Sequence, residues 1–248
     1  QGQNRTREAC TAQRGPSWDT PTTVNVVCTT TNVGFDRYGF AHPRGRGEGT
    51  ALLQCLNEAE RVHAHIVAVQ EHKIGRYDHA HLPELDDAGD WEWLGFPGDK
   101  RGKRGLGFLL RTGVVVQGSK GMSMEEGEVA TLLVLVDMVK IGVINTYWSC
   151  RANAESLTIM LEHIRAGADD LANQGAGVVI LLGDLNVDML QRTASTKGLE
   201  QEIEGEVGMR RIDMEGSNAE WVTHIKGQSH LDCMAIRAHC ECAVGDTW

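Results

Sequence analysis

The chain has 248 residues, 41% of them hydrophobic and 23% charged, and this length suits one large domain with a substantial core. Its formal net charge of -10 at pH 7 excludes a generally basic nucleic-acid coat, although a local basic loop on an acidic body can still bind phosphates. No apolar stretch approaches the roughly 20 residues that cross a bilayer, and the N-terminus is not built as a signal peptide. We therefore expect a soluble protein.

The cysteines predict a reducing compartment. There are seven of them, an odd number, and they lack the tight regular spacing of a disulfide scaffold. An intracellular protein is the simplest interpretation.

The first half of the chain predicts an arm, a strand, a helix and a second strand. Residues 1–22 are polar and lack hydrophobic periodicity, so we expect a flexible N-terminal arm ahead of one domain over 23–248. β-branched residues alternate over 24–30 and predict a strand. Residues 48–63 place apolar side chains on one helical face, and the strand 66–69 follows directly.

The second half predicts a series of strands interrupted by one long helix. Residues 77–103 look irregular, because prolines and aspartates break every periodic pattern there. An amphipathic helix is expected over 154–172, and a short helix within the charged segment 190–213. The expected strands are 105–110, 114–117, 130–136, 140–147, 178–182, 221–223 and 231–236.

Antiparallel runs and helical crossovers therefore occur in one chain. This mixture favours an α/β fold with two packed sheets over a doubly wound Rossmann sheet, and no glycine fingerprint for dinucleotides follows any strand.

Two of the expected strands end in carboxylates. Asp184 and Asn186 follow the apolar run 178–182, and Glu71 follows the run 66–69. Buried strands also end in acidic residues simply because the chain must surface and solvate its polar groups there. Two such ends nevertheless suggest a shared acidic floor at one edge of the fold, where open α/β sheets build their sites.

Six short motifs follow one another along residues 24–248: Asn32, Gln70-Glu71, Gly105-Leu106-Gly107-Phe108, Asn145-Thr146-Tyr147, Gly183-Asp184-Leu185-Asn186 and Ser229-His230-Leu231-Asp232. Their order resembles the endonuclease/exonuclease/phosphatase superfamily. Within it the chain looks most like the apurinic-type endonuclease domain of non-LTR retrotransposons. The resemblance implies a four-layer α/β/β/α sandwich of two mixed sheets, the DNase I-like fold, and Mg²⁺-dependent phosphodiester hydrolysis in which Mn²⁺ can substitute.

The resemblance also implies residue roles. Glu71 would coordinate Mg²⁺, a hard cation that prefers carboxylate oxygens, and Asn32 would support that metal site. Asp184 would orient the attacking water and help deprotonate it. Asn186 would donate its amide hydrogens to a phosphate oxygen as charge builds, and Tyr147 would hydrogen-bond the phosphate from the opposite wall.

The closing segment carries the remaining implied roles. Asp232 would hold a catalytic histidine in the correct tautomer, and Thr223 would lie near the metal and the phosphate. In the family that histidine belongs to a Ser-Asp-His motif beyond the Leu-Asp strand, and none is present before Trp248. We therefore expect that the domain is truncated before this motif. The chain also departs from the family after Tyr147, where Trp148 replaces the usual proline.

One basic loop is a candidate for substrate binding. Arg101, Lys103 and Arg104 lie in a five-residue basic segment of an otherwise acidic protein, and such a segment could follow a DNA backbone. A solvated charged turn is the alternative interpretation.

Three functions remain open from the sequence. The leading hypothesis is a DNA-nicking endonuclease of a retrotransposon, which would act in the nucleus and would have a reverse transcriptase region in its parent polyprotein. A second keeps the fold but makes the protein a stand-alone phosphatase or RNA exonuclease. A third is a catalytically inactive binding or structural subunit.

Overall fold

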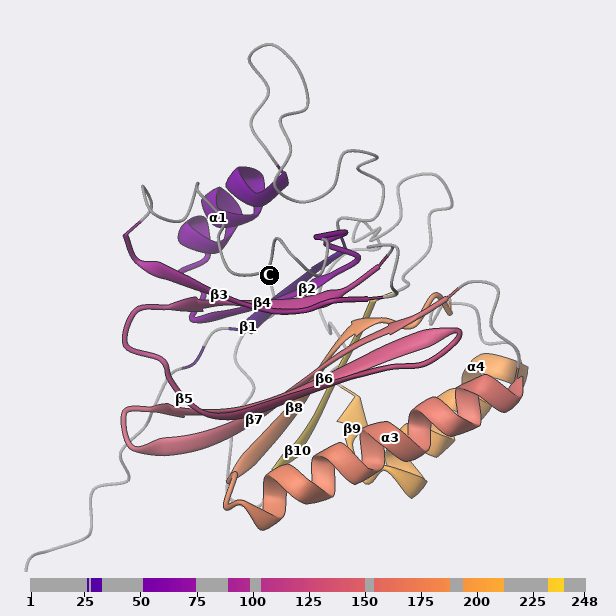
Figure 1. Ribbon diagram of the computed structural model, residues 1–248. Helices are drawn as coiled ribbons and strands as arrows, with labels where there is room; N and C mark the ends of the chain where they lie inside the picture. Colours follow the sequence, from indigo (N-terminus) through magenta and orange to yellow (C-terminus); the bar gives the residue numbers. More distant parts are fainter. Residues whose placement is uncertain are drawn as a thin grey trace, which may run out of the picture.

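Two β-sheets pack face to face and carry helices on their outer faces, which gives four layers (Figure 1). Helix α1 (Ala51–Arg61) covers the smaller sheet, and helices α3 (Ala154–Asn173) and α4 (Ala194–Gln201) lie on the outer side of the larger one. The predicted α/β/β/α sandwich is confirmed. The computed structural model describes residues 26, 28–32, 51–74, 89–98, 104–149, 154–187, 194–211 and 232–238.

The smaller sheet has four strands in the order β1-β2-β4-β3. Its first two strands are parallel, because α1 returns the chain to the same end of the sheet, and the other neighbours are antiparallel. The strands are β1 (Cys28–Asn32), β2 (Ile66–Gln70), β3 (Trp91–Phe96) and β4 (Leu106–Arg111).

The larger sheet has six strands in the order β5-β6-β7-β8-β10-β9. Only β7 and β8 are parallel, with α3 as their crossover, and the short π-helix η1 (Glu202–Glu206) follows α4. The strands are β5 (Val115–Ser123), β6 (Gly127–Val136), β7 (Val139–Trp148), β8 (Val178–Asp184), β9 (Arg210–Arg211) and β10 (Asp232–Ala238).

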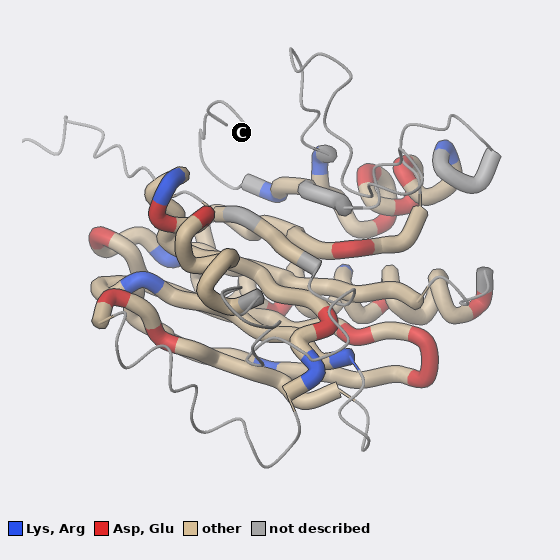
Figure 2. Tube along the Cα trace, turned by 90° about the horizontal axis from the view of Figure 1, so that it is seen from above, with Lys and Arg blue, Asp and Glu red and all other residues tan. Residues whose placement is uncertain are grey.

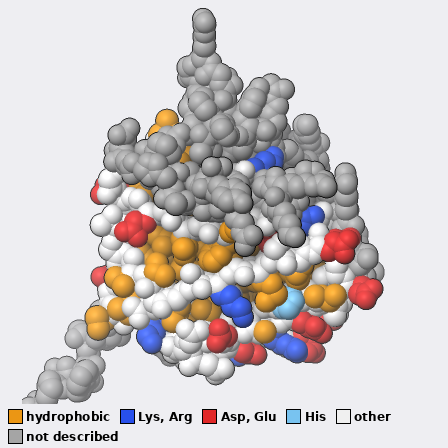
Figure 3. Space-filling view, viewed as in Figure 1, with side chains coloured by type: hydrophobic (Ala, Val, Ile, Leu, Met, Phe, Trp, Pro, Cys, Tyr) orange, Lys and Arg blue, Asp and Glu red, His pale blue; other side chains and the backbone are white. Residues whose placement is uncertain are grey.

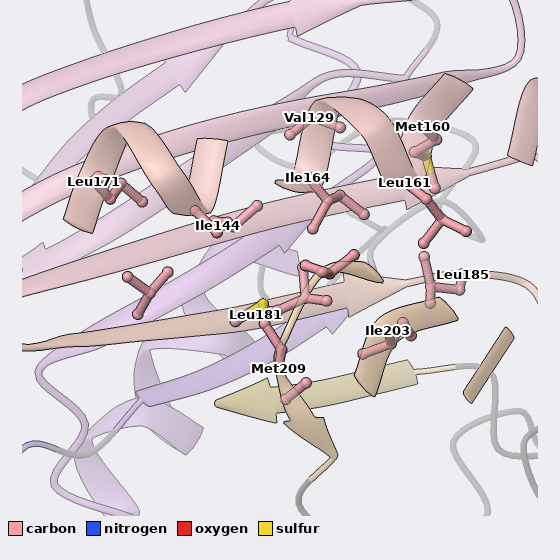
Figure 4. Packing of buried hydrophobic residues seen from close by; sticks show 14 of the residues in the cluster. Val129, Ile144, Met160, Leu161, Ile164, Leu171, Leu181, Leu185, Ile203 and Met209 are labelled. Atoms are coloured by element: carbon pink, nitrogen blue, oxygen red, sulfur yellow. The ribbon is translucent and has the colours of Figure 1, made fainter. Parts of the chain in front are cut away.

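Alternation along the strands divides the apolar side chains among three buried clusters. In β7, Val143 packs between the two sheets, whereas the next residue, Ile144, packs under α3. Figure 4 shows this outer cluster, in which Ile164 and Leu171 of α3 point toward the larger sheet. A third cluster lies between α1 and the smaller sheet. Two-sided burial explains why the central strands read as nearly continuous apolar runs.

Most predicted elements are confirmed within a few residues, and one prediction is wrong. The segment 77–103 was expected to be irregular, but residues 91–96 form β3 at the edge of the smaller sheet. These residues form a strand because their backbone hydrogen-bonds to β4, and the local residue pattern does not predict this pairing. The first strand begins at Cys28 rather than at residue 24. The predicted arm 1–22 and the strand 221–223 lie outside the described residues.

Charged residues lie at turns, strand ends and helices, while the interiors of the central strands are largely uncharged (Figure 2). Figure 3 shows that hydrophobic side chains gather in the middle of one face of the molecule. Of the helices in the described part of the chain, none combines the length and the apolar character that a membrane crossing requires.

Candidate active site at the rim between the sheets

Strand register brings three of the predicted site residues into one row of the larger sheet. Tyr147 of β7 lies opposite Asp184 of β8 in the parallel pair, and the backbone of Asp232 lies opposite Asp184 in the antiparallel pair with β10. In the smaller sheet the backbone of Asn32 pairs with Gln70, which directly precedes Glu71. Strand ends from both sheets therefore carry the predicted residues.

The side chains of Tyr147 and Asp184 point into the space between the sheets. Tyr147 belongs to the apolar cluster between the sheets and is 8% exposed, and Asp184 continues the face of Leu182, which belongs to the same cluster. Asp184 itself is 4% exposed, and Glu71 is half-buried. The three groups thus meet where strand ends of the two sheets come together, at the rim of the sandwich.

Electrostatics shows that the two carboxylates act on the same phenol. Burial raises the pKa of Tyr147 well above its ordinary value, the charge of Glu71 and a hydrogen bond with it raise the pKa further, and the charge of Asp184 adds to this. The Arg104 guanidinium opposes the shift. Tyr147 therefore stays protonated at every physiological pH, and Glu71, Asp184 and Arg104 all lie close to it.

The turn after β8 holds Asp184 and Asn186 in a fixed arrangement. The Asn186 backbone N–H donates to Asp184 Oδ1 at 2.7 Å, and Asn186 Nδ2 donates to the Trp148 carbonyl oxygen at 2.5 Å. Asn186 has φ +49°, a left-handed conformation that asparagine tolerates better than most residues. Gly183 has φ +150°, and a Cβ there would lie 2.1 Å from the Thr146 carbonyl oxygen.

Two further site residues adopt left-handed backbone conformations. Glu71 has φ +53° and Arg104 has φ +80°, although neither is glycine. Such conformations cost free energy and persist where the surroundings enforce them, commonly at functional sites. The backbone of Arg104 is held because the N–H of Lys73 donates to its carbonyl oxygen at 2.9 Å, and its guanidinium donates to the Glu125 carbonyl oxygen at 2.9 Å.

Two buried polar residues beside the site were missed from the sequence. Glu128 is 3% exposed, lies opposite Tyr147 in the register of β6 and β7, and accepts the Gly105 N–H at 2.9 Å. The strand predicted from the sequence began at residue 130, so Glu128 fell outside it, although it is the one charged residue of β6. His72 is fully buried; its Nδ1 accepts the Ile74 N–H at 2.9 Å.

The ring of His72 fixes the turn that carries Glu71. Its Nε2 lies 3.1 Å from the carbonyl oxygens of Phe96 and Leu106. Because Nδ1 accepts a hydrogen bond, these contacts require a neutral imidazole with the proton on Nε2. Nothing in the local sequence distinguishes this buried histidine from a surface one, because its partners come from β3 and β4.

The remaining predicted residues are only partly described or not described. Asn32 and Asp232 are placed by their backbones alone, whereas Thr223, Arg101 and Lys103 lie outside the described residues. Their roles stay predictions.

The donor set at the rim suits a hard divalent cation. Mg²⁺ is commonly held by one or two carboxylates together with several waters, and the described residues provide Glu71 and Asp184. Within the described ranges, no group of three or more His, Cys, Asp or Glu side chains is arranged to hold a metal ion. Two carboxylates match the number of protein ligands that Mg²⁺ commonly takes, so Glu71 and Asp184 are the described residues that could hold one.

Comparisons with known proteins identify the fold. No protein-family model and no curated protein matches the sequence. The endonuclease domain of TRAS1, a telomere-specific non-LTR retrotransposon, superposes with a TM-score of 0.55 at 13% identity, over 83% of this chain and 82% of that chain. Danio rerio TDP2 in complex with a single-strand DNA product superposes with a TM-score of 0.52 at 13% identity, over 86% and 84%.

A truncated TDP2 from Caenorhabditis elegans also superposes, with a TM-score of 0.50 at 14% identity over 76% of this chain and 77% of that one. At these identities the likeness establishes the fold and leaves the reaction to be argued from the site. The fold expected from the ordered motifs is confirmed: the chain has the four-layer DNase I-like fold that these structures share.

Proposed function

We propose that this protein is a Mg²⁺-dependent phosphodiesterase and that its substrate is DNA. The observation that carries the proposal is the convergence of Glu71 and Asp184 on one buried phenol, Tyr147, at the rim between the sheets. Two carboxylates, a protonated phenol and the nearby Arg104 guanidinium form a set suited to binding a phosphate and hydrolysing it.

Glu71 and Asp184 are the described residues that would hold the metal ion, with Asn32 as a further oxygen donor. When bound, the ion would supply Lewis-acid stabilisation of charge on a phosphate oxygen. Mn²⁺ takes similar oxygen ligands and is expected to substitute for it.

The chain's own side chains account for the remaining steps. Asp184 is held by the Asn186 N–H and would accept a proton from the attacking water. Tyr147 cannot act as a base, because its pKa is raised. Its single hydroxyl hydrogen, which is shared with Glu71 in the free protein, would turn to a phosphate oxygen when substrate binds. Arg104 would attract the phosphate through its fixed positive charge, and Asn186 would offer the second hydrogen of its Nδ2, beside the one bonded to the Trp148 carbonyl oxygen, as negative charge develops.

The finer proposal is that the protein nicks DNA as the endonuclease domain of a non-LTR retrotransposon, with a reverse transcriptase region in its parent polyprotein and a nuclear place of action. The likeness to the TRAS1 endonuclease domain supports it, and the DNA product in the similar TDP2 structure supports DNA as the substrate. The basic segment 100–104 offers charges that could follow a DNA backbone.

The test is nicking of supercoiled plasmid in Mg²⁺, with and without chelator. We expect Asp184→Asn to reduce the nicking rate by about 10²- to 10⁴-fold, because it keeps the shape of the side chain but removes the carboxylate that would accept the proton and help to hold the metal ion. Asp169→Asn is the matched control, since Asp169 pairs with Arg237, and Arg237 lies opposite Val179 at the far end of β8 from Asp184. Equal rates for the two variants would refute the assigned chemistry.

The alternatives predict different results in the same series of assays. A stand-alone phosphatase or RNA exonuclease would leave the plasmid intact but would hydrolyse phosphoinositide or poly(A) in an Asp184-dependent manner. A catalytically inactive binding subunit would bind DNA without hydrolysing any of these substrates.

A further inference from the structure

We propose that Asn145 is a positioning residue that sets the spacing between the rims of the two sheets, and thereby holds Glu71 in its working place relative to Tyr147 and Asp184. This inference rests on the proposed function, because a spacing matters for activity only if the two rims act together. Asn145 and its partner Gln70 are both fully buried.

The hydrogen bonds of Asn145 cross the interface between the sheets. Its Nδ2 donates to the carbonyl oxygens of Val69 and Gly107, each at 3.0 Å, and its Oδ1 accepts from Gln70 Nε2 at 2.6 Å. Val69 and Gly107 are opposite each other in the register of β2 and β4. One carboxamide of the larger sheet therefore binds two neighbouring strands of the smaller sheet.

The same bonds reach a third strand through Gln70. Its Nε2 also donates to Thr30 Oγ1 of β1 at 2.9 Å. The set of Thr30, Gln70 and Asn145 thus links β1, β2 and β4 to β7.

The position of this set relative to the site argues for alignment rather than for stability alone. Gln70 directly precedes Glu71, and Asn145 lies two residues before Tyr147 on the same face of β7. Gly107, whose carbonyl oxygen accepts from Asn145, lies three residues after Arg104. Each hydrogen bond therefore ends within three residues of a group that acts on the proposed phosphate.

The layer around Asn145 is otherwise apolar, and burying a carboxamide in such a layer costs free energy. A functional role for this side chain would explain why it lies there. Its register partners on either side are Ala130 of β6 and Leu182 of β8, both of which belong to the apolar cluster between the sheets. A leucine would bury well in such a layer, because buried polar groups give little net stability over apolar ones of similar shape. Directional bonds, in contrast, fix relative positions that apolar contacts leave loose.

The experiment compares Asn145→Leu with Thr146→Val. Thr146 is the next residue of β7, is also fully buried, and donates one hydrogen bond to the Glu128 carbonyl oxygen at 3.2 Å, but it faces α3 through Met160. Both variants remove buried hydrogen bonds from one strand, and only the first removes bonds between the sheets. We expect Asn145→Leu to lower kcat for plasmid nicking by about 100-fold with KM nearly unchanged. Thr146→Val should keep both constants near wild type.

A double-mutant cycle separates positioning from general damage. In a Glu71→Gln background the further effect of Asn145→Leu on kcat should largely disappear, because the group that it aligns no longer works. Full additivity of the two substitutions would overturn the proposal. Gln70→Met removes one of the three bonds of Asn145, together with the hydrogen bonding between Gln70 and Thr30, and leaves the two bonds to backbone carbonyl oxygens. It should give an intermediate loss, and it keeps the test decisive if Asn145→Leu folds poorly.

Hydrogen exchange tests the inference without relying on hydrolysis. The amides of His72 and Lys73 donate to the carbonyl oxygens of Gly105 and Arg104 at 3.3 and 2.9 Å, directly beside Glu71. We expect Asn145→Leu to speed their exchange more than Thr146→Val does. Equal exchange in the two variants would overturn the positioning role. Wild-type protein that hydrolyses nothing, with faster exchange in Asn145→Leu, would instead refute the proposed function and leave the link between the sheets supported.

Discussion

Tyr147 lies between two carboxylates, and its high pKa decides what it can do. Burial first, and then Glu71 and Asp184, hold the pKa of the folded phenol above its ordinary value of about 10. We expect the wild type and Tyr147→Phe to show the same rise in tyrosinate absorbance up to about pH 11, because Tyr147 does not ionise in the folded protein. A larger rise in the wild type would contradict the buried, protonated phenol.

The same shift predicts how stability depends on pH at the alkaline end. Tyr147 ionises near pH 10 in the unfolded chain but only at higher pH in the folded protein. Its contribution to stability is therefore complete below about pH 10 and is lost as the pH rises further. In Tyr147→Phe, the free energy of unfolding from urea denaturation should fall less steeply above that pH than in the wild type. Parallel curves would argue against the linkage.

Gly183 allows the Asp184 turn to pack against β7. A Cβ at this position would meet the Thr146 carbonyl oxygen at 2.1 Å, and φ is +150°. We expect Gly183→Ala to lower the free energy of unfolding by about 3 kcal/mol or more, from steric overlap together with backbone strain. Gly198→Ala in α4, where no atom lies within 4 Å of the new Cβ, should be neutral or stabilising by up to about 1 kcal/mol. Similar losses in both would refute this reason for the glycine.

The sequence predicted those site residues whose position follows from the local pattern of apolar and polar residues. Glu71 and Asp184 follow buried strands, so their convergence could be expected from the topology of an α/β fold. Glu128, His72 and Asn145 were not identified as site residues, because their roles depend on partners 23 to 76 positions away. Those partnerships exist only after the two sheets have packed together.

At the scale of elements, a hydrogen bond from a buried tryptophan side chain and an ion pair attach α1 to the smaller sheet. Glu60 accepts a hydrogen bond from Trp91 Nε1 at 2.7 Å and pairs with Arg111, whose guanidinium lies 5.3 Å from the Trp91 ring centroid. Apolar packing of Leu52 and Leu56 supplies the rest of the contact. The helix that carries these residues also forms the connection between β1 and β2, and so supports Glu71 indirectly.

Glu60→Gln should therefore weaken the attachment of α1 at neutral pH. The Arg111 hydrogen bond first, and then that of Trp91, hold the pKa of Glu60 below its ordinary range. A lowered pKa contributes stability above the ordinary value of about 4.3 and loses it as pH falls through the folded-state pKa. Because Glu60 is about half exposed, solvent screening limits the effect to about 0.5–1 kcal/mol in the free energy of unfolding.

The control for Glu60 lies on the same helix. Glu58 pairs with Arg61, and both side chains are well exposed. Chemical denaturation should show that Glu58→Gln changes stability by less than about 0.5 kcal/mol, while the wild type and Glu60→Gln converge at acid pH. A Glu60→Gln protein as stable as the Glu58→Gln protein at pH 7 would contradict the fastening of α1 through Glu60.

Helices were easier to predict than strands for a physical reason. The apolar stripes of α1 and α3 extend over 11 and 20 residues, so the sequence of each helix predicts which of its faces is buried. Edge strand β3 has six residues and, among the described strands, hydrogen-bonds to β4 alone. Its Trp91 and Trp93 alternate with Glu92 and Leu94, a pattern too short to outweigh the flanking irregular sequence.

At the scale of the whole molecule, the acidic charge of the chain opposes the substrate that we propose. A net charge of -10 repels a DNA backbone, so binding must depend on local positive charge near the rim. Arg104 is the one basic residue in the described part of the chain that bears on the pKa of Tyr147, and the basic segment 100–103 directly precedes it. This arrangement predicts an interaction with DNA that is local and strongly dependent on salt.

Replacing Lys100, Arg101 and Lys103 with serine should weaken DNA binding and flatten its salt dependence. Each phosphate contact contributes a slope of about -0.9 to the logarithm of affinity against the logarithm of salt concentration, so three lost contacts should reduce the steepness by about 2 to 3. Fluorescence anisotropy with a labelled duplex, titrated at several salt concentrations in the presence of chelator, measures this slope apart from hydrolysis.

The decisive control removes the same charge at described residues outside the turns that carry Glu71, Tyr147 and Asp184. These are Arg165 of α3, Lys120 of β5 and Lys140 at the start of β7. Replacing these three with serine makes the net charge equally more negative, so a general electrostatic effect would lower affinity to the same extent in both variants. We expect the slope to change only when the segment 100–103 is altered. Equal slopes in the two variants would remove this segment from the binding surface and would leave Arg104 as the candidate contact to the backbone.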